Sequence, residues 1–417
     1  MIDAASEPLW DIVEEHLDEA EFLWEQWEAS LVAPNYVLSE VEEGPEARLL
    51  AHVDGLVVNG PRVVERLLLP TLADVDAEPT RVRAAALALL HAPGEAGLAA
   101  VLAGLRELPP QRPELARALE CCDSGPLAAR LGPLLADEDA DLRYTAARVL
   151  AYHGEALPDV ARAIFGGAGP GRTVERVLGL RVVPRLTEGL RFRKDVLAAL
   201  ASDDPELRDA GMTSGALLDL PQAWGVAREL AAAGDADAGR ALLLLALRGE
   251  PADRPLLAAA VDGAALRRSA LWALGFLGTG EAVELAVPWL EDGACARLAG
   301  EVVAAVTGVN LEDEHLTAVA PEDEALVHRP EDDLPLPDAM AVLKWWRRRR
   351  GDFAGEQRRV DGRPRDADAL RAALREGPMR RRAAHLLGLQ LGCPPGRGPA
   401  LEPTAPGRRQ RRELAAL

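Results

Sequence analysis

Lysine, cysteine and aromatic residues are scarce in this sequence of 417 residues, in which lysine occurs only twice and aromatic residues make up 4%. The four cysteines, Cys121, Cys122, Cys295 and Cys393, form no CxxC motif and have no regular spacing. This argues against a disulfide framework or a zinc ribbon. No stretch approaches the roughly 18 apolar residues that a membrane span requires, and the first residues do not resemble a secretory signal. We therefore expect a cytoplasmic protein.

Lysine and arginine are absent from the first 47 positions, and the whole chain carries a formal charge of −20. This charge is unevenly distributed. Residues 341–417 contain 19 basic and 8 acidic residues, a net charge of +11, which leaves −31 for residues 1–340. The negative excess argues against nucleic acid or an anionic membrane as a partner. The contrast between the two parts predicts either internal docking or a partner that binds one end.

The N-terminal part reads as a helical cap, residues 1–75. Apolar residues recur every three or four positions from Pro8 to Leu31, which predicts one amphipathic helix. Its other faces are acidic, and like charges four residues apart destabilise a helix. The acidic faces are therefore either solvated or covered by arginine-rich sequence.

Residues 76–310 contain a repeat of about eight units. An arginine followed by an apolar stretch recurs at intervals of 26 to 34 residues, at Arg83, Arg117, Arg143, Arg176, Arg208, Arg240, Arg267 and Arg297. An acid stands five residues before the arginine in six units, at Glu78, Glu138, Asp203, Asp235, Asp262 and Asp292. A small residue follows three positions after it in six, at Ala86, Ala146, Gly179, Gly211, Ala270 and Gly300. Arg117 and Arg176 lack the acid.

These columns fit stacked helical hairpins. The acid can cap the next helix, the arginine can reach a nearby acid, and the small residue allows close approach of a neighbouring helix. A single hairpin cannot bury its apolar face alone, so the units must stack. The pattern resembles HEAT and HEAT-like repeats. This resemblance implies an all-α fold, an α-α superhelix or HEAT-like solenoid with an N-terminal helical cap and a basic C-terminal arm.

Three segments follow the repeats. Residues 311–338 are rich in proline and acids, which predicts an extended acidic linker. Residues 339–395 contain a basic helix with Trp345, Trp346, Arg347, Arg348, Arg349 and Arg350, then an apolar helix, Arg380–Leu391, that caps the stack. Residues 396–417 are rich in proline, glycine and arginine, and we expect a disordered tail.

The Trp-Trp-Arg segment has three interpretations. Arginine binds phosphate and tryptophan stacks on bases, which is typical of a nucleic-acid site, but the −31 on residues 1–340 opposes it. A docking element is favoured more: the tryptophans would pack on the solenoid while the arginines meet the acidic linker or the N-terminal helix. The third interpretation is an amphipathic capping helix with a solvated basic face.

The chain as a whole resembles a proteobacterial family of HEAT-repeat proteins of uncharacterised function. The first matching blocks are Glu14–Trp24 and Arg48–Leu56. Later blocks are Ala299-Gly300-Glu301, Val306-Thr307-Gly308, Leu334–Asp338, Trp345-Trp346 and Gly377–Ala384. This chain departs from the family at Leu336, where the family has an aromatic residue, and at Arg347–Arg350 and Arg358-Arg359. The resemblance implies a genetic setting in type VI secretion clusters and assigns no catalytic residue.

Motifs for chemistry are missing. None of the seven histidines forms a metal-binding spacing, and Asp313-Glu314-His315 is the only tight cluster of histidine and carboxylates. No nucleophile elbow or phosphate-binding loop is present. The sequence thus predicts no catalytic residue, no cofactor and no metal.

We interpret the protein as a non-enzymatic HEAT-like scaffold or adaptor for a protein partner. The acidic solenoid predicts that this partner is basic, and the family resemblance implies a link to type VI secretion. The alternative is an enzyme on a HEAT-like scaffold, of the lyase or DNA-glycosylase type. A deep pocket that gathers two or more polar residues with shifted pKa values would count against the scaffold.

Overall fold

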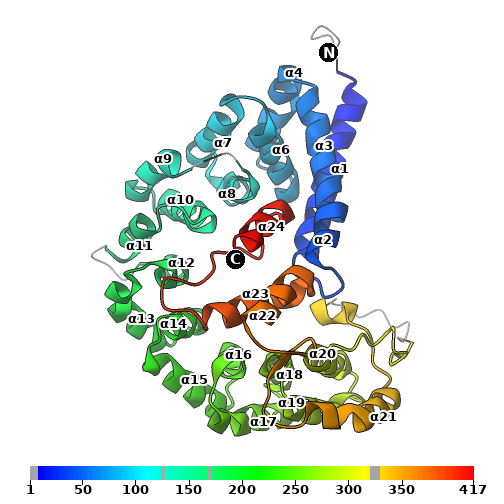
Figure 1. The fold of residues 1–417 in the computed structure, drawn as a ribbon. Helices are drawn as coiled ribbons and strands as arrows, with labels where there is room; N and C mark the ends of the chain where they lie inside the picture. Colours follow the sequence, from blue (N-terminus) through cyan, green and yellow to red (C-terminus); the bar gives the residue numbers. More distant parts are fainter. Residues whose placement is uncertain (1–7, 124, 126, 167–170, 320–328) are drawn as a thin grey trace. The chain divides into compact units, whose positions relative to one another are not determined.

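The computed structural model describes residues 8–123, 125, 127–166, 171–319 and 329–417. The chain forms two units. Unit 1 contains residues 1–31, 38–178 and 402–413, and unit 2 contains residues 32–37, 179–401 and 414–417. Both are built almost entirely from helices (Figure 1). No helix among the described residues is long and apolar enough to cross a membrane.

Unit 1 begins with the long helix α1, against which α3 and α6 pack, and continues through α6, α8 and α10, which pack on one another in turn. Turns of π-helix at Glu42–Glu46 and Val64–Leu68, and 3₁₀ turns at Pro109–Gln111 and Gly132–Ala136, link its helices. Its helices are α1 (Trp10–Ser30), α2 (Leu38–Val41), α3 (Ala47–Val58), α4 (Pro61–Val63), α5 (Leu69–Ala73), α6 (Pro79–His91), α7 (Ala96–Glu107), α8 (Arg112–Cys121), α9 (Ala128–Leu131), α10 (Ala140–His153), α11 (Leu157–Phe165) and most of α24 (Gly407–Ala415). Helix α12 (Thr173–Val182) crosses the boundary between the units.

Unit 2 is a two-layered stack. Helices α14, α16, α18 and α20 form one layer, and α13, α15, α17 and α19 the other. Its elements are α13 (Arg193–Leu200), α14 (Pro205–Leu217), α15 (Pro221–Ala233), α16 (Gly239–Arg248), α17 (Arg254–Asp262), α18 (Arg267–Leu277), α19 (Gly280–Ala286), α20 (Ala296–Thr307), α21 (Ala339–Arg349), β1 (Arg359–Val360), β2 (Arg363–Pro364), α22 (Ala367–Glu376) and α23 (Met379–Gln390), with 3₁₀ turns at Val183–Arg185, Gly189–Phe192, Pro251–Asp253, Val287–Trp289, Pro330–Asp333 and Arg350–Phe353. Strands β1 and β2 pair antiparallel. The alternating layers confirm the predicted all-α, HEAT-like fold class.

The repeat arginines lie on alternate helices. The eight positions fall on α6, α8, α10, α12, α14, α16, α18 and α20, near the start of each except in α8. Three of them share one contact: Arg143, Arg208 and Arg267 each donate to the carbonyl oxygen six residues earlier, at 2.6, 3.4 and 3.0 Å. The predicted pairing with an acid is confirmed at Arg83, which pairs with Glu114 of α8, but it does not describe these three contacts. The guanidinium groups satisfy carbonyls in the turn that precedes their helix, where the backbone lacks helical partners.

The predicted capping acids are off by one position in two units. Asp139 and Asp204, four residues before the arginine, accept the N–H groups that begin α10 and α14. The neighbouring Glu138 and Asp203 do not. The role of the small residues is visible at Gly211, where an added Cβ would lie 2.9 Å from the Cβ of Ala199 on α13. Adjacent helices can thus approach closely at this column.

The predicted helix from Pro8 to Leu31 is confirmed as α1. Its acidic face meets arginines of the first repeats. Arg81 pairs with Asp18 at 2.5 Å, and Glu28 pairs with Arg83 and Arg117, both at 2.7 Å. Part of the like-charge repulsion on α1 is therefore offset within unit 1.

The linker and the tail differ from expectation. The described flanks of the linker pair with each other, Thr317 with Pro337, and Leu316 and Leu334 are buried. The remainder of that prediction, residues 320–328, lies outside the described residues. The tail is ordered and includes α24, whose Gln410 is fully buried. The disorder was predicted from composition alone, and composition does not show which residues elsewhere in the chain the tail contacts.

The division into units also differs from the predicted domains 1–75, 76–310, 311–338, 339–395 and 396–417. The predicted repeat domain is split at residues 178/179, and residues 32–37 and 402–413 join units far from them in sequence. Contacts of this kind follow from tertiary packing, which a local repeat pattern does not encode.

Candidate functional site

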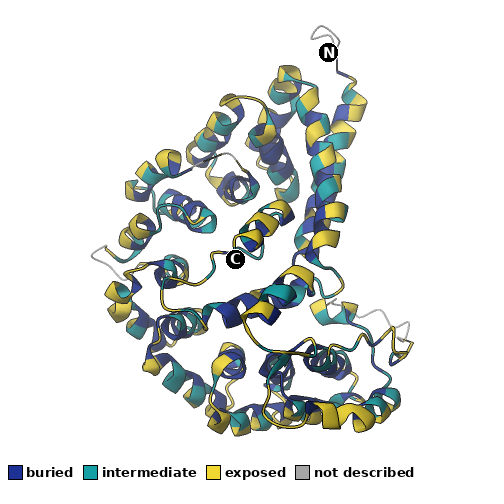
Figure 2. Ribbon diagram, viewed as in Figure 1, coloured by how far each residue is buried: buried dark blue, intermediate teal, exposed yellow. Residues whose placement is uncertain are grey.

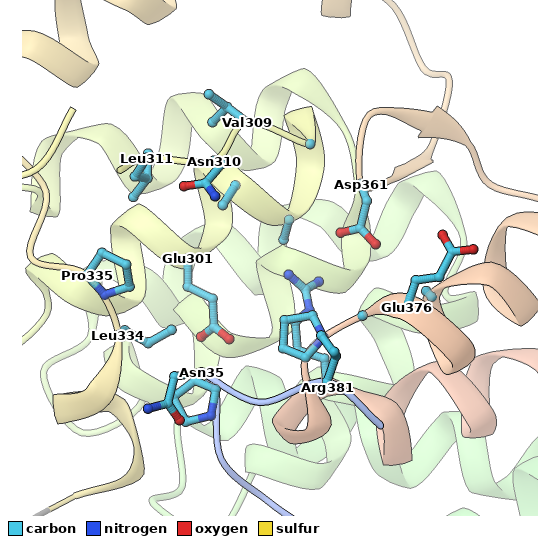
Figure 3. A pocket seen from close by; sticks show the side chains of 18 of the residues that line it. Asn35, Glu301, Val309, Asn310, Leu311, Leu334, Pro335, Asp361, Glu376 and Arg381 are labelled. Carbon is cyan, nitrogen blue, oxygen red and sulfur yellow. The ribbon is translucent and has the colours of Figure 1, made fainter. Parts of the chain in front are cut away.

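A cavity of about 940 Å³ opens in unit 2 between α20, the linker flank, the β1–β2 hairpin, α22, α23 and residues 34–37. Its floor is the face of α20 that carries Arg297, Glu301, Ala304 and Ala305. Residues 34–37 reach it because Val37 pairs with Pro378 as an isolated antiparallel bridge. Figure 3 shows Glu301, Asp361 and Arg381 around the same open space, each from a different element.

Glu301 is the buried acid of this pocket, with 10% of its side chain exposed. Its carboxylate lies 3.4 Å from Nε of Arg380, which itself reaches Glu331 at 3.4 Å. Desolvation raises the pKa of Glu301, and the charges of Arg381 and Arg380 oppose this only in part. The charges of the two arginines therefore do not fully compensate the Glu301 carboxylate for its loss of hydration.

Arg381 forms the opposite wall and is 4% exposed. One of its terminal N–H groups donates to the carbonyl oxygen of Gly275 at 3.1 Å, and its guanidinium lies 4.8 Å from the ring centre of Phe276. Its Nε atom has no hydrogen-bond partner among the described residues. One terminal N–H group thus holds the Arg381 guanidinium against α18, while its Nε–H group has no acceptor among the described residues.

The hairpin places Asp361 at the mouth of the pocket. Asp361 has a left-handed backbone, with φ of 48°, and its N–H donates to the carbonyl of Ala305 at 2.9 Å. The next N–H, of Gly362, donates to Val306 at 3.2 Å. The hairpin thereby caps the C-terminal end of α20. Burial raises the pKa of the Asp361 carboxyl, against the charges of Arg381 and Arg363.

The lining has more acids than bases. Six carboxylates face three guanidinium groups, namely Glu301, Glu312, Asp332, Asp333, Asp361 and Glu376 against Arg297, Arg363 and Arg381. Two of the three guanidiniums also serve the fold, because Arg297 donates to the carbonyl of Leu334 and Arg381 to that of Gly275. The pocket is therefore suited to a cationic group.

The predicted docking residues lie elsewhere, on α21. Trp346 is 2% exposed, and its indole N–H donates to Glu284 of α19 at 2.9 Å. Trp345 is half-buried against the same core. The arginines that follow are exposed (Figure 2). Within the described part of the chain, Arg349 pairs only with Asp352, at 3.1 Å, and no ion pair is seen for Arg347, Arg348 or Arg350.

Of the predicted repeat arginines, Arg297 alone lines this pocket; Arg83, Arg143, Arg208, Arg240 and Arg267 do not. Asp313-Glu314-His315 is exposed, and no group of histidine, cysteine and carboxylates among the described residues could hold a metal ion. Sequence reasoning missed Glu301 and Arg381 as site residues. Both stand in blocks that carry the family resemblance, which could have drawn attention to them.

Comparisons with known proteins give a fold likeness and no family. No protein-family model matches the chain, and no curated protein matches it. Among solved structures, the X-ray structure of YibA from Escherichia coli, a structural genomics target, is similar at 12% sequence identity and a TM-score of 0.32. The match covers 68% of this chain and 94% of that one.

Proposed function

We propose that the protein is a non-enzymatic HEAT-like scaffold for a protein partner with a basic surface, and that the pocket of unit 2 receives an arginine or lysine side chain of that partner. One observation carries the proposal. The pocket gathers six carboxylates against three guanidinium groups, and its buried acid Glu301 has a raised pKa.

The raised pKa values of Glu301 and Asp361 favour a cationic ligand. A carboxylate whose pKa is raised by desolvation is short of stabilising charge, and an entering cation supplies it. The hydrogen bonds so formed would be charge-assisted and shielded from water, which makes them stronger than exposed ion pairs. The negative lining would also speed the encounter with a basic partner.

The pocket meets the condition that counts against the scaffold interpretation, because two acids with shifted pKa values line it. We assign these acids to recognition and not to catalysis because, besides carboxylates, the polar side chains of the described lining are guanidinium groups and amides, with no hydroxyl, thiol, imidazole or amine among them. The enzyme alternative, of the lyase or glycosylase type, has no comparable support. A link to type VI secretion is part of the proposal and depends on the family resemblance alone.

Binding of a short arginine-containing peptide to the full chain tests the proposal. We expect saturable binding by fluorescence anisotropy at low salt, and no binding of the same peptide with glutamate in place of arginine. Asp361→Asn and Glu301→Gln should each weaken binding by about tenfold, as expected for loss of a charge-assisted contact. Affinity should rise with pH as the two acids ionise.

Glu291→Gln is the matched control, because Glu291 is exposed and lies outside the pocket. It removes the same charge and should leave the affinity unchanged. Equal losses in Glu291→Gln and Glu301→Gln would reduce the effect to net charge and contradict the pocket. Absence of binding at low salt would contradict the basic partner.

A further inference from the structure

The C-terminal segment Glu402–Glu413 lies in unit 1, held by residues from the start of the chain. The N–H of Gly407, where α24 begins, donates to Oε2 of Glu46 at 2.6 Å, and the N–H of Arg408 lies 3.4 Å from Oε1. Glu46 is 3% exposed and also accepts the indole N–H of Trp27 at 3.1 Å. A carboxylate 361 residues away thus caps the positive end of this helix.

The arginines of α24 contact three separate places on unit 1. Arg409 donates to the carbonyl of Tyr152 at 2.8 Å and lies 3.2 Å from Nδ1 of His153. Arg411 pairs with Glu42 of the turn Glu42–Glu46, and Arg412 pairs with Asp123 at 2.7 Å. The cations are therefore matched to two acids and a helix-terminal carbonyl, which fixes the orientation of the helix.

Unit 1 also binds the backbone of this segment. Arg117 of α8 donates to the carbonyl of Thr404 at 3.2 Å, while the same guanidinium contacts Glu28 at 2.7 Å and the hydroxyl of Tyr152 at 3.1 Å. Burial raises the pKa of the Tyr152 hydroxyl, so this group stays a neutral partner. Arg117 is thus held in place by α1 and α10 and presents one free edge to the segment.

The segment has internal order of its own. The amide of Gln410, which is fully buried, donates to the carbonyls of Pro403 and Ala405 at 2.9 and 2.6 Å. These bonds close the turn that precedes α24. The segment therefore has hydrogen bonds of its own in addition to the hydrogen bonds and ion pairs that it forms with unit 1.

The contact at Gly407 is selective. An added Cβ there would lie 3.1 Å from Cβ of Glu42 and 3.2 Å from Oε2 of Glu46, and both of these residues are buried. These distances are shorter than ordinary van der Waals contact, so a larger residue would have to displace the capping carboxylate. The site accepts glycine at the first position of a basic helix.

We propose that unit 1 contains a binding site for a basic helix of the pattern Gly-x-Arg-x-Arg-Arg, and that the chain's own segment Glu402–Glu413 occupies it in cis. A partner that carries such a helix binds by replacing this segment, which is joined to unit 2 through the proline- and glycine-rich residues 394–399. The site is separate from the pocket of unit 2 and does not depend on its function.

The test uses the full chain and a fluorescein-labelled peptide of residues 402–417. In the variant Arg411→Glu/Arg412→Glu, loss of both ion pairs should release the segment, and the peptide should bind at least about tenfold more tightly than to the unaltered chain. Arg408→Glu is the matched control, because Arg408 is exposed and no side-chain ion pair involves it among the described residues. It should behave like the unaltered chain.

Two further changes locate the peptide. Adding Glu46→Gln to the opened variant should weaken binding by about tenfold, whereas adding Glu301→Gln should leave it unchanged and so separate this site from the pocket. A peptide with Gly407→Leu should not compete. This last measurement involves no change to the protein and so cannot fail through misfolding.

Amide hydrogen exchange of residues 402–417 reports whether the segment is released. A released segment without peptide binding would make α24 a structural cap and overturn the proposal. Equal binding by the unaltered chain would show that the site is not occupied in cis. A segment that stays as protected in the opened variant as in the unaltered chain would show that the ion pairs do not hold it, and would also overturn the proposal.

Discussion

Two arginine-rich helices, α21 in unit 2 and α24 in unit 1, look alike in sequence and are held in opposite ways. Helix α21 is attached by the buried Trp346, and the four consecutive arginines at its C-terminal end, Arg347 to Arg350, are exposed. Helix α24 is attached through its arginines and its N-terminus, and buries Gln410 between them. Consecutive residues on a helix point in directions 100° apart, so four arginines in a row cannot face one surface. In α24, Arg409 and Arg411 lie on either side of the inward-facing Gln410, and both can reach the surface that Gln410 faces.

The largest effect is expected from Trp346→Ala, which removes the apolar attachment of α21. Loss of a buried tryptophan costs about 3–5 kcal/mol of unfolding free energy. Urea denaturation followed by circular dichroism measures it. Trp346→Phe keeps most of the burial and loses the bond to Glu284, so its cost should be smaller, about 1–2 kcal/mol. A loss for Arg348→Ala as large as that for Trp346→Ala would contradict attachment through tryptophan.

Glu46→Ala tests the polar attachment of α24 and should cost about 2–3 kcal/mol, because it leaves the buried N–H groups of Trp27 and Gly407 without an acceptor. The same denaturation experiment applies. Glu43→Ala is the control: Glu43 is exposed on the same turn, and its loss should stay within about 0.5 kcal/mol. Similar values for the two variants would mean that α24 does not depend on its cap.

The solenoid could be predicted from the sequence because its signals are local. Apolar spacing gave α1, and the arginine interval placed Arg83 to Arg297 on alternate helices. The capping acids were misplaced by one residue because Asp137-Glu138-Asp139 and Asp203-Asp204 offer adjacent candidates. Which of these takes the extended backbone of an N-cap is decided by the turn before it.

The candidate site and the docked tail could not be predicted, because both depend on contacts between distant segments. Glu301 stands on a repeat helix and looks like a surface acid until α22, α23 and the hairpin enclose it. Likewise Glu46 and Gly407 have no common signal in sequence. The proline, glycine and arginine content of the tail was interpreted as disorder, although arginine is well suited to fixed pairs when acids lie opposite.

Charge reversal should affect the two helices differently, with a smaller effect than the substitutions above. Arg411→Glu should lower the unfolding free energy by about 1 kcal/mol at low salt, because its partner Glu42 is largely buried while Arg411 is mostly exposed. This loss should become smaller in about 0.5–1 M salt, which screens the charges. Arg348→Glu should change stability by less than about 0.3 kcal/mol at either salt concentration. A salt-dependent loss in Arg348→Glu would reveal a partner for the arginines of α21 and remove the contrast.

The smallest expected effect is a pH dependence of the unfolding free energy that arises at Glu46, the residue that caps α24. Burial raises the pKa of Glu46 above its usual 4.5, and the charge of Glu42 adds to this rise, although the hydrogen bonds from Gly407, Arg408 and Trp27 oppose it. The unfolded chain therefore ionises Glu46 at lower pH than the folded chain does, so folding loses stability as pH rises from about 4.5 through the raised value and is constant above it. The difference in unfolding free energy between the unaltered chain and Glu46→Gln should follow this course. A difference that grows in favour of the unaltered chain with rising pH would mean that the hydrogen bonds from Trp27, Gly407 and Arg408 outweigh desolvation, and that α24 is held most tightly when Glu46 is charged.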